Sequence, residues 1–423
     1  MKNIIIVGDG MADHPVERLG GKTPLQYADT PFMDTIARQG RTGKLTTIPE
    51  GFPPGSEVAN TTILGYDPVN VYEGRGPLEA AGMGYDMEAA DMALRCNIIT
   101  TDDGKIVSHN GGNINSVIAR EIISRLNGGI NSDRVRFVEG TLCQHLLVIK
   151  GGNKNVSCFP PHEHIGEQME KIAVTAEEGL EDRRDVFTDG DGRKHERMTS
   201  RQTARLLNET IRKSQDILKD LSHGKERYSI WPWSGGYRPD MPSLSEIHPQ
   251  IRSGCVISAV NLVRGIGLHA GLDIIKVKGA TGHADTNYEG KAAAAINALR
   301  RYDFVFVHVE APDEASHEGD LRMKLQAITD IDHRLIAPIY NHIVQSDEPV
   351  AIAILPDHPT PVETRIHESE PVPFALYYKG MTPDGVKTFD EASTSNGAYG
   401  TMPAKHLMEK MLEAGTDTAL RTN

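Results

Sequence analysis

The chain contains 423 residues, more than one hydrophobic core usually organises, so we expect two domains or one domain that carries a large insertion. A formal net charge of -13 argues against nucleic acid or an anionic membrane as a partner, and an anionic substrate would have to meet metals and a few arginines. No apolar run reaches the roughly 18 residues that span a bilayer, and the N-terminus meets Gly8 and Asp9 too early for a signal peptide, which predicts a soluble, cytoplasmic protein.

The first and last parts of the chain are predicted to alternate short strands with helices. Residues 3–7 are rich in isoleucine and end at a glycine, which is typical of a buried parallel strand. Residues 303–309 and 350–355 repeat this pattern, and residues 290–300 and 324–344 have helical character. Strands and helices in this order predict an α/β fold with a mostly parallel sheet that helices cover on both faces.

The middle of the chain has a different pattern of predicted elements and charged residues. Residues 91–150 mix short strands with Gly and Asn turns, residues 177–197 are highly charged, and residues 200–221 have the pattern of a long amphipathic helix. This change predicts an inserted α+β cap domain. The predicted organisation is an α/β core of residues 1–87 and 229–423 around a cap at residues 88–228.

Cysteine and glycine patterns exclude several kinds of site. The four cysteines are scattered without a C-x-x-C pair, which suits a reducing compartment and argues against a disulfide frame or a thiolate zinc site: Cys96, Cys143, Cys158 and Cys255. The motif GDG is an incomplete dinucleotide fingerprint, and no P-loop is present.

Ligand-type side chains follow three of the predicted strands. In open parallel sheets the ligand lies beyond the carboxyl ends of the strands, where the loops converge. Any one of these residues also fits a helix cap or a turn, but three strand ends that all supply Asp and His are hard to explain as coincident caps. Carboxylates mixed with imidazoles favour manganese, zinc or magnesium. The predicted ligands are Asp9, Asp313, His317, Asp357, His358 and His367.

Ser56 is the candidate nucleophile. It lies in GFPPGSEVANTTILGYDP, at the start of a helix predicted from Glu57, where a serine also fits an N-cap. The free backbone N–H groups at a helix N-terminus stabilise a phosphate ester. Because a serine hydroxyl is a weak nucleophile until its pKa falls, this hypothesis requires Ser56 to bind a metal.

These motifs together resemble a known family. GDGMAD, GSEVANTTILGYDP, YEGRGPLEAAGMG, RCN, GATG with DTNYEGK, HVEAPDEASHEGD and the pair Asp357-His358 are similar to the archaeal-type cofactor-independent phosphoglycerate mutases of the alkaline phosphatase superfamily. The likeness covers nearly the whole chain. It implies an alkaline-phosphatase-like fold, two divalent ions, a serine that is phosphorylated, a cap domain, and no need for 2,3-bisphosphoglycerate.

The resemblance also implies how the ligands divide between the ions. One ion would be held by Asp313, His317 and His367, and the other by Asp9, Ser56, Asp357 and His358. The expected reaction is the interconversion of 3-phosphoglycerate and 2-phosphoglycerate, a step of glycolysis and gluconeogenesis, on a small phosphorylated substrate. The oligomeric state stays open.

The phosphate and carboxylate groups of the substrate need cationic hydrogen-bond donors. Arginine suits both groups because its planar guanidinium group binds two oxygens at once. Arg75, between two glycines in EGRGPLEA, is the first candidate for catalysis and substrate binding. His109 is the candidate acid and base for the substrate hydroxyl. The further candidates for substrate binding are Arg95, Arg264, Lys278 and Lys291. For each of these except Arg75, a solvated surface position is the commoner role.

Two other features have weaker functional interpretations. His162 and His164 in PPHEH are spaced like a metal pair but fit a solvated, proline-rich turn better. Trp231 and Trp233 fit structural packing better than ligand stacking.

Three alternative functions stay open from the sequence. The same chemistry would serve a phosphotransferase that acts on another small hydroxy compound such as homoserine, which would need a phosphoryl donor. It would also serve a metal-dependent phosphomonoesterase, in which water resolves the phosphoserine. A catalytically silent metal-binding protein is disfavoured because Ser56 is retained among the ligands.

Overall fold

A computed structural model describes residues 1–130 and 132–413. The chain divides into two compact units. The core unit combines Met1–Tyr72 with the chain from Met241 onward, and the inserted unit is Glu73–Asp240. The inserted unit extends beyond the predicted range of 88–228 at both edges, because helix α5 (Arg75–Gly82) and the end of strand β12 (Glu226–Gly236) pack within it.

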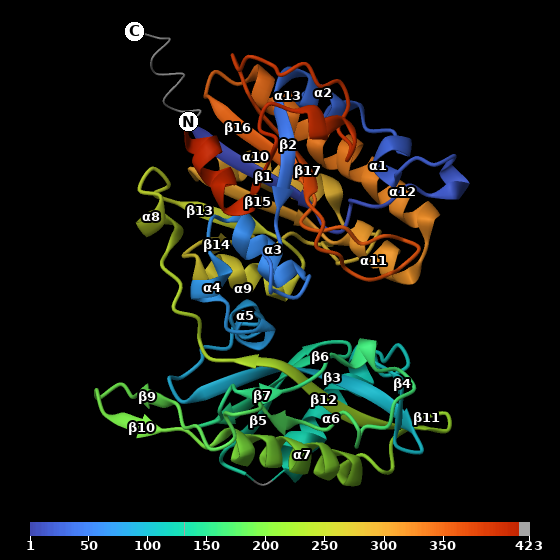
Figure 1. The fold of residues 1–423 in the computed structure, drawn as a ribbon, viewed down its shortest axis with the longest axis vertical. Helices are drawn as coiled ribbons and strands as arrows, with labels where there is room; N and C mark the ends of the chain where they lie inside the picture. The colour runs from blue at the N-terminus through green and yellow to red at the C-terminus, as the bar shows by residue number, and fades with distance from the viewer. Residues whose placement is uncertain (131, 414–423) are drawn as a thin grey trace. The chain divides into compact units, whose positions relative to one another are not determined.

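The core unit contains an eight-stranded, mostly parallel sheet, within the described part of the chain. The strand order is β14-β13-β15-β1-β16-β17-β2-β18, and only the pairings of β17 with β16 and with β2 are antiparallel. Figure 1 shows β1 between β15 and β16. The strands are β14 (Asp273–Ile274), β13 (Gly254–Ile257), β15 (Phe304–Val309), β1 (Lys2–Gly8), β16 (Val350–Leu355), β17 (Val372–Tyr378), β2 (Arg41–Thr46) and β18 (Thr401–Pro403).

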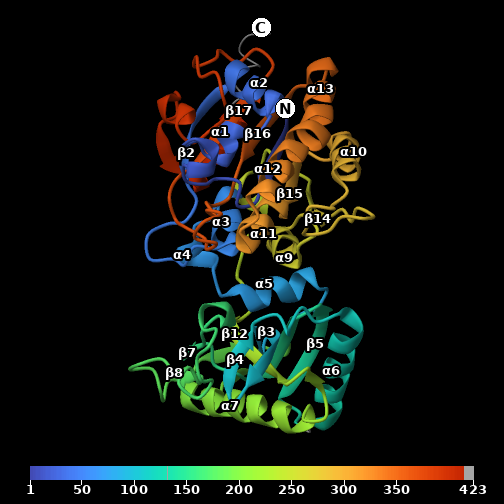
Figure 2. The same ribbon diagram turned by 90° about the vertical axis from the view of Figure 1, so that its right-hand side faces the viewer.

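Helices cover both faces of this sheet, as the continuous apolar strands require. Ile4 and Ile6 point to one face and share a buried cluster with residues of α2, α10, α12 and α13. Three of these helices, α10, α12 and α13, lie along the same side of the sheet in Figure 2. Helix α9 packs on the other face, where Gly267 lies against the side chain of Val256. The predicted α/β class with a mostly parallel, doubly covered sheet is therefore confirmed.

The core helices keep most of the predicted positions, with one interruption. The segment predicted as a single helix at 324–344 is divided by a π-helical turn, η3 (Ile331–Ile336). That turn brings Asp332 to the start of α2, where its carboxylate accepts the Met33 N–H at 2.7 Å. The longer helices are α2 (Pro31–Gln39), α3 (Ser56–Ile63), α9 (Asn261–His269), α10 (Tyr288–Leu299), α11 (Ala311–Glu318), α12 (Leu321–Asp330) and α13 (Ala337–Gln345). The one-turn helices are α1 (Pro24–Tyr27), α4 (Pro68–Val71) and α8 (Leu244–Ile247), with 3-10 turns at Glu17–Leu19, Ser393–Asn396 and Ala404–His406.

The inserted unit is an antiparallel sheet with helices on both faces. Its main sheet has the order β11-β12-β3-β6-β5, with β4 paired to β3. The elements are α5, β3 (Asp91–Asp102), β4 (Lys105–Ser108), α6 (Ser116–Gly129), β5 (Val135–Thr141), β6 (Gln144–Lys150), α7 (Ser200–Ile217), β11 (Ser222–His223) and β12. Two small ribbons pair β7 (Val156–Ser157) with β8 (Thr175–Ala176) and β9 (Val186–Thr188) with β10 (Lys194–Glu196), and a 3-10 turn covers Pro161–Glu163.

Side chains along β3 point alternately to the two faces of the inserted unit's main sheet, and helices cover both faces. Leu94 and Ile98 belong to a cluster with α6 and α7, which lie on one face of the sheet (Figure 1). Ala93 points to the opposite face and packs with Ala80 of α5. Gly76 of α5 lies directly on the Ala93 carbonyl, so this glycine permits close packing of helix on strand.

No helix of the described chain is long and apolar enough to cross a membrane.

Candidate metal centre

Three adjacent parallel strands end side by side and carry the candidate ligands. In the register of the core sheet, Gly8 of β1 lies beside Val309 of β15, and Val7 lies beside Leu355 of β16. The loops that leave these strands therefore begin at the same edge of the sheet. This geometry brings the side chains that follow β1, β15 and β16 together, although more than 300 residues separate the first from the last.

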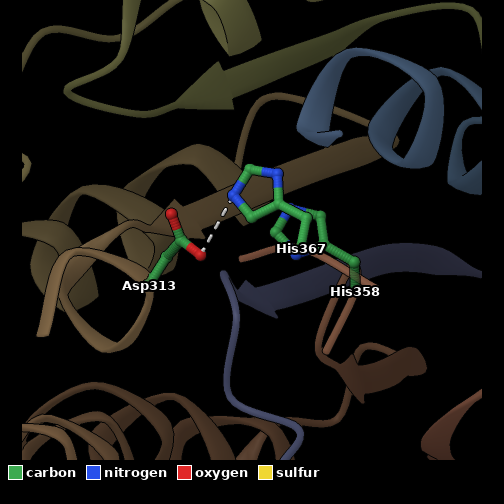
Figure 3. Close-up of side chains that lie close together, drawn as sticks. All are labelled: Asp313, His358 and His367. Carbon is green, nitrogen blue, oxygen red and sulfur yellow. Dashed lines mark ion pairs between the residues drawn. The ribbon is translucent and has the colours of Figure 1, made fainter. Parts of the chain in front are cut away.

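The first group of ligands forms around Asp313. Asp313 and His317 lie one turn apart on α11, and His317 Nε2 is 3.1 Å from Asp313 Oδ2. His367, in the loop after β16, places Nε2 3.4 Å from Asp313 Oδ1 and 2.9 Å from His317 Nε2. Figure 3 shows the rings of His358 and His367 beside each other, with His367 directed at Asp313. Two imidazole nitrogens and a carboxylate thus converge on one point.

The second group forms around Asp9. His358 Nε2 lies 3.4 Å from Asp9 Oδ1 and 3.6 Å from Asp357 Oδ2, and all three side chains are fully buried. Ser56 Oγ lies 3.1 Å from His358 Nε2 and 3.4 Å from Asp9 Oδ2. The two groups meet at His358, which is close enough to join either.

Ser56 reaches this position because it is the first residue of α3 rather than its cap. The N-cap position is Gly55, which has no side chain to cap the helix, so the hydroxyl of Ser56 is directed at the ligands. Asn60, one turn later, donates from Nδ2 to the Ser56 carbonyl and to Asp357 Oδ2, both at 2.9 Å. This contact fixes the start of α3 against the loop after β16.

Two residues of this cluster were not predicted from the sequence. His308 is the penultimate residue of β15 and is fully buried, with Nε2 3.0 Å from Asp9 Oδ2. Glu310 follows the same strand, with Oε2 3.9 Å from His308 Nδ1. A histidine inside an otherwise apolar strand was the available signal, because imidazole is rarely placed in a sheet core without a partner.

The electrostatics of the cluster fit a bound cation. Burial raises the pKa of Asp9 well above its ordinary value, and the carboxylates of Asp357, Glu310 and Asp313 raise it further. Asp9 Oδ1 has no hydrogen-bond partner among the described residues. Buried carboxylates gathered in this way are stabilised when a cation neutralises them. Hard oxygens mixed with imidazoles suit manganese, zinc or magnesium, so the donor set fits the predicted ions.

The cationic candidates from the core unit have different surroundings. Lys291 is buried, its Nζ donates to the His308 carbonyl at 3.0 Å, and burial lowers its pKa to about 8. Arg264 donates from Nε to the Ser258 carbonyl at 2.8 Å. Lys278 is exposed. Of these three side chains, the structure brings only Lys291 next to the cluster.

The remaining candidates lie in the inserted unit around a buried carboxylate. Arg75 Nε donates to Glu79 Oε1 at 2.7 Å, and Arg95 donates to the same oxygen. Burial alone would raise the pKa of Glu79, but Arg95 and Arg75 hold it below its ordinary value. Both guanidinium groups lie over the ring of Trp233, at 5.7 Å and 5.9 Å from its centre.

His109 and His162 lie near this cluster, whereas His164 Nδ1 lies 3.2 Å from Glu167 Oε1. The ring of His162 is 6.1 Å from that of His109 and 5.8 Å from that of Trp233. Trp233 donates to Asn97 Oδ1 at 3.1 Å, whereas Trp231 is buried in the main core of the inserted unit. Arg75 and Arg95 therefore both lie against Trp233, and His109 lies beside His162. The roles of these candidates in substrate binding stay predictions.

Comparison with known sequences gives consistent matches, and the relatives named below align with nearly the whole chain. A sequence model described as 2,3-bisphosphoglycerate-independent phosphoglycerate mutase matches residues 37–223. A protein of that name from Methanosarcina acetivorans is 45% identical over 418 residues, which cover 98% of this chain and 100% of that protein. A relative of the same name, numbered 2, from Methanothermobacter thermautotrophicus is 43% identical over 98% of both chains.

Solved structures show the same likeness. A protein from Pyrococcus horikoshii matches with a TM-score of 0.76 and 27% identity, covering 97% of this chain and 96% of that one. A cofactor-independent phosphoglycerate mutase from Thermoplasma acidophilum matches with a TM-score of 0.60 and 25% identity, covering 98% of this chain and 100% of that one.

Proposed function

The chain belongs to the 2,3-bisphosphoglycerate-independent phosphoglycerate mutase family, and on that premise we propose that it interconverts 3-phosphoglycerate and 2-phosphoglycerate through a phosphoserine at Ser56. One observation carries the proposal. The Ser56 hydroxyl lies within 3.4 Å of both Asp9 and His358, at the edge of the sheet where buried carboxylates and imidazoles gather. The hydroxyl does not cap the helix, because the N-cap position of α3 is Gly55.

Two divalent ions are the proposed cofactors. Asp313, His317 and His367 would hold one, and a second set would hold the other: Asp9, Ser56, Asp357 and His358. When bound, the ions would neutralise the substrate phosphate and lower the pKa of the Ser56 hydroxyl. The names of the relatives support independence from 2,3-bisphosphoglycerate. The candidate metals are manganese, zinc and magnesium.

The protein residues perform the transfer in two balanced steps. The Ser56 oxygen, having lost its proton to a neighbouring base, attacks phosphorus, and the bond from phosphorus to the substrate oxygen breaks. The leaving oxygen takes up a proton and glycerate is formed. The second hydroxyl of the same glycerate then loses its proton and attacks the phosphorus of phosphoserine 56. The bond from phosphorus to the Ser56 oxygen breaks, and that oxygen takes up a proton, which restores the serine. Exclusion of water until this second attack separates a mutase from a phosphatase.

Four side chains are proposed to bind the substrate in this mechanism. Lys291 has the best support, because it is buried beside His308 at the cluster. Arg75, Arg95 and His109 are proposed to bind the substrate, with Arg75 balancing phosphate charge and His109 serving as acid and base. We also propose a cytoplasmic location and a small phosphorylated partner.

A panel of assays tests this function. The purified protein with Mn²⁺ is given 3-phosphoglycerate with an enolase-coupled readout, homoserine with ATP, and a generic phosphomonoester. We expect the first rate to exceed the other two by orders of magnitude. Turnover of the generic ester alone would make the protein a phosphomonoesterase, and preferred turnover of homoserine would make it a phosphotransferase.

A further inference from the structure

A buried lysine joins the loops that follow β1 and β16, which carry several of the candidate metal ligands. Lys324 of α12 is fully buried, and its Nζ donates to Asp13 Oδ2 at 2.7 Å and to the Thr360 carbonyl at 2.8 Å. Asp13 Oδ2 also accepts the Val362 N–H at 3.0 Å. The Thr360 N–H donates to the Ala12 carbonyl at 3.2 Å. The two loops that carry Asp9 and His358 are thus held together by one buried ion pair and its hydrogen bonds.

Thr360 connects this ion pair to the two ligand groups. Its Oγ lies 2.6 Å from Asp313 Oδ1 and 3.1 Å from His358 Nδ1, and the threonine is fully buried. A hydroxyl has a single proton to donate, and a carboxylate oxygen can only accept. The Thr360 proton must therefore go to Asp313, which leaves the Thr360 oxygen to accept a proton from His358.

This assignment fixes the tautomer of His358. If Nδ1 carries the proton, Nε2 of the neutral ring presents a lone pair. That nitrogen is the one that faces the Ser56 hydroxyl at 3.1 Å and Asp9 at 3.4 Å. With the opposite tautomer, Nε2 would carry a hydrogen toward the position where a metal is needed. A metal-ligating histidine is commonly held in this way by a partner on its other nitrogen.

We propose that Thr360, held in place by the Lys324–Asp13 pair, is a positioning residue that sets the tautomer of His358 and the orientation of Asp313. The inference rests on the proposed metal role of these two residues. Thr360 itself touches neither substrate nor metal in this account. Its hydroxyl links one ligand of each proposed ion, so its loss affects both sites.

Three variants test the role of the hydroxyl. Thr360→Val keeps the shape of the side chain and removes the hydroxyl, Thr360→Ser keeps the hydroxyl, and Thr47→Val makes the same change at a buried threonine whose Oγ has no partner among the described residues. We expect Thr360→Val to weaken Mn²⁺ binding, measured by calorimetry, about 10–100-fold. Thr360→Ser and Thr47→Val should bind as the wild-type protein does. A loss below about threefold in Thr360→Val, or an equal loss in Thr360→Ser, would overturn the proposal.

The tautomer gives a readout that does not depend on metal binding. In metal-free protein with ¹⁵N-labelled histidine, the His358 signals are identified by their loss in His358→Gln. We expect a protonated Nδ1 and a bare Nε2 in the wild-type protein, and a change of this pattern in Thr360→Val. A protonated Nε2 in the wild-type protein, or an unchanged pattern in the variant, would overturn the proposal. Failure of the wild-type protein to bind Mn²⁺ would instead overturn the proposed function, and the tautomer would still decide this inference.

Discussion

Asp9 in the core unit and Glu79 in the inserted unit are both buried carboxylates, but their surroundings have opposite effects. Burial raises the pKa of Asp9, and Asp357, Glu310 and Asp313 add to the rise. Burial also acts on Glu79, but Arg95 and Arg75 reverse its effect and lower the pKa. At Glu79 the inserted unit thus balances a buried charge with its own side chains, whereas around Asp9 the core unit gathers carboxylates whose charge a cation from outside the chain would neutralise.

The largest effect on stability is expected where the charge is already balanced. Glu79→Gln leaves two arginines without their carboxylate, so we predict a loss of about 3–5 kcal/mol in the free energy of unfolding. Urea unfolding followed by tryptophan fluorescence measures it, because both tryptophans of the chain, Trp231 and Trp233, lie in the inserted unit. Glu139→Gln, at an exposed pair with Arg120, is the control and should cost less than about 1 kcal/mol. Equal losses would remove the distinction between buried and exposed pairs.

The stability of the inserted unit should depend on pH through His145, a buried group that the structure holds neutral. Its Nδ1 accepts the Gly140 N–H at 3.0 Å and its Nε2 donates to the Leu142 carbonyl at 2.8 Å, so the ring must be neutral. Burial lowers the pKa of His145 from 6.5 to about 4. Between these values only the unfolded chain binds the proton. The stability from this group is therefore complete above pH ~6.5 and is lost as the pH falls to ~4, by about 3 kcal/mol at most.

The matched variant for this titration is His145→Asn, which has no titrating ring. Its stability deficit relative to the wild-type protein should shrink as the pH falls from 7 to 4, with tryptophan fluorescence as the measurement. A deficit that stays constant over this range would show that His145 is not held neutral.

Metal removal should affect the core unit selectively. Mn²⁺ at 100 times its dissociation constant would stabilise the folded state by about 2.7 kcal/mol, and a chelator would remove that stabilisation. Hydrogen exchange measures this loss of stabilisation at the ends of β1, β15 and β16, whose amides should exchange faster after chelation. Protection that is unchanged at these strand ends, or that falls first in β3 and β6 of the inserted unit, would place the metal elsewhere.

The smallest predicted change in the free energy of unfolding is an increase rather than a loss. Asp9→Asn removes one charge from a cluster of like charges, so we predict that it stabilises the metal-free protein by about 1 kcal/mol or more. The same variant should lose most of its response to Mn²⁺. Thermal unfolding in chelator and in Mn²⁺ measures both effects. Destabilisation of the metal-free protein, as predicted for Glu79→Gln, would mean that the charge of Asp9 is already balanced.

Local patterns were sufficient to predict three of the core strands and the residues at their ends. The apolar runs at 3–7, 303–309 and 350–355 correspond to β1, β15 and β16, because a strand buried on both faces is apolar throughout. The parallel arrangement then brings Asp9, Asp313 and Asp357 to the same edge, which is the geometry that the candidate site required.

Features that depend on distant contacts were not predictable from the sequence. The π turn at Ile331–Ile336 accompanies the contact of Asp332 with the start of α2, and Thr360 and Lys324 gain their roles only when the loops after β1 and β16 meet. Gly76, one of the two glycines that flank Arg75, lies against the Ala93 carbonyl and so serves packing within the inserted unit. A local motif does not reveal which surface a glycine faces.

The most direct test of the account follows the phosphoryl group itself. The wild-type protein is mixed with 3-phosphoglycerate and Mn²⁺, quenched in acid within one turnover, and digested for mass spectrometry. We predict one phosphoryl group on the peptide that contains Ser56, assigned to that residue, and neither phosphopeptide nor turnover in Ser56→Ala. Normal turnover in Ser56→Ala, or a phosphoryl group on a different side chain, would contradict the account.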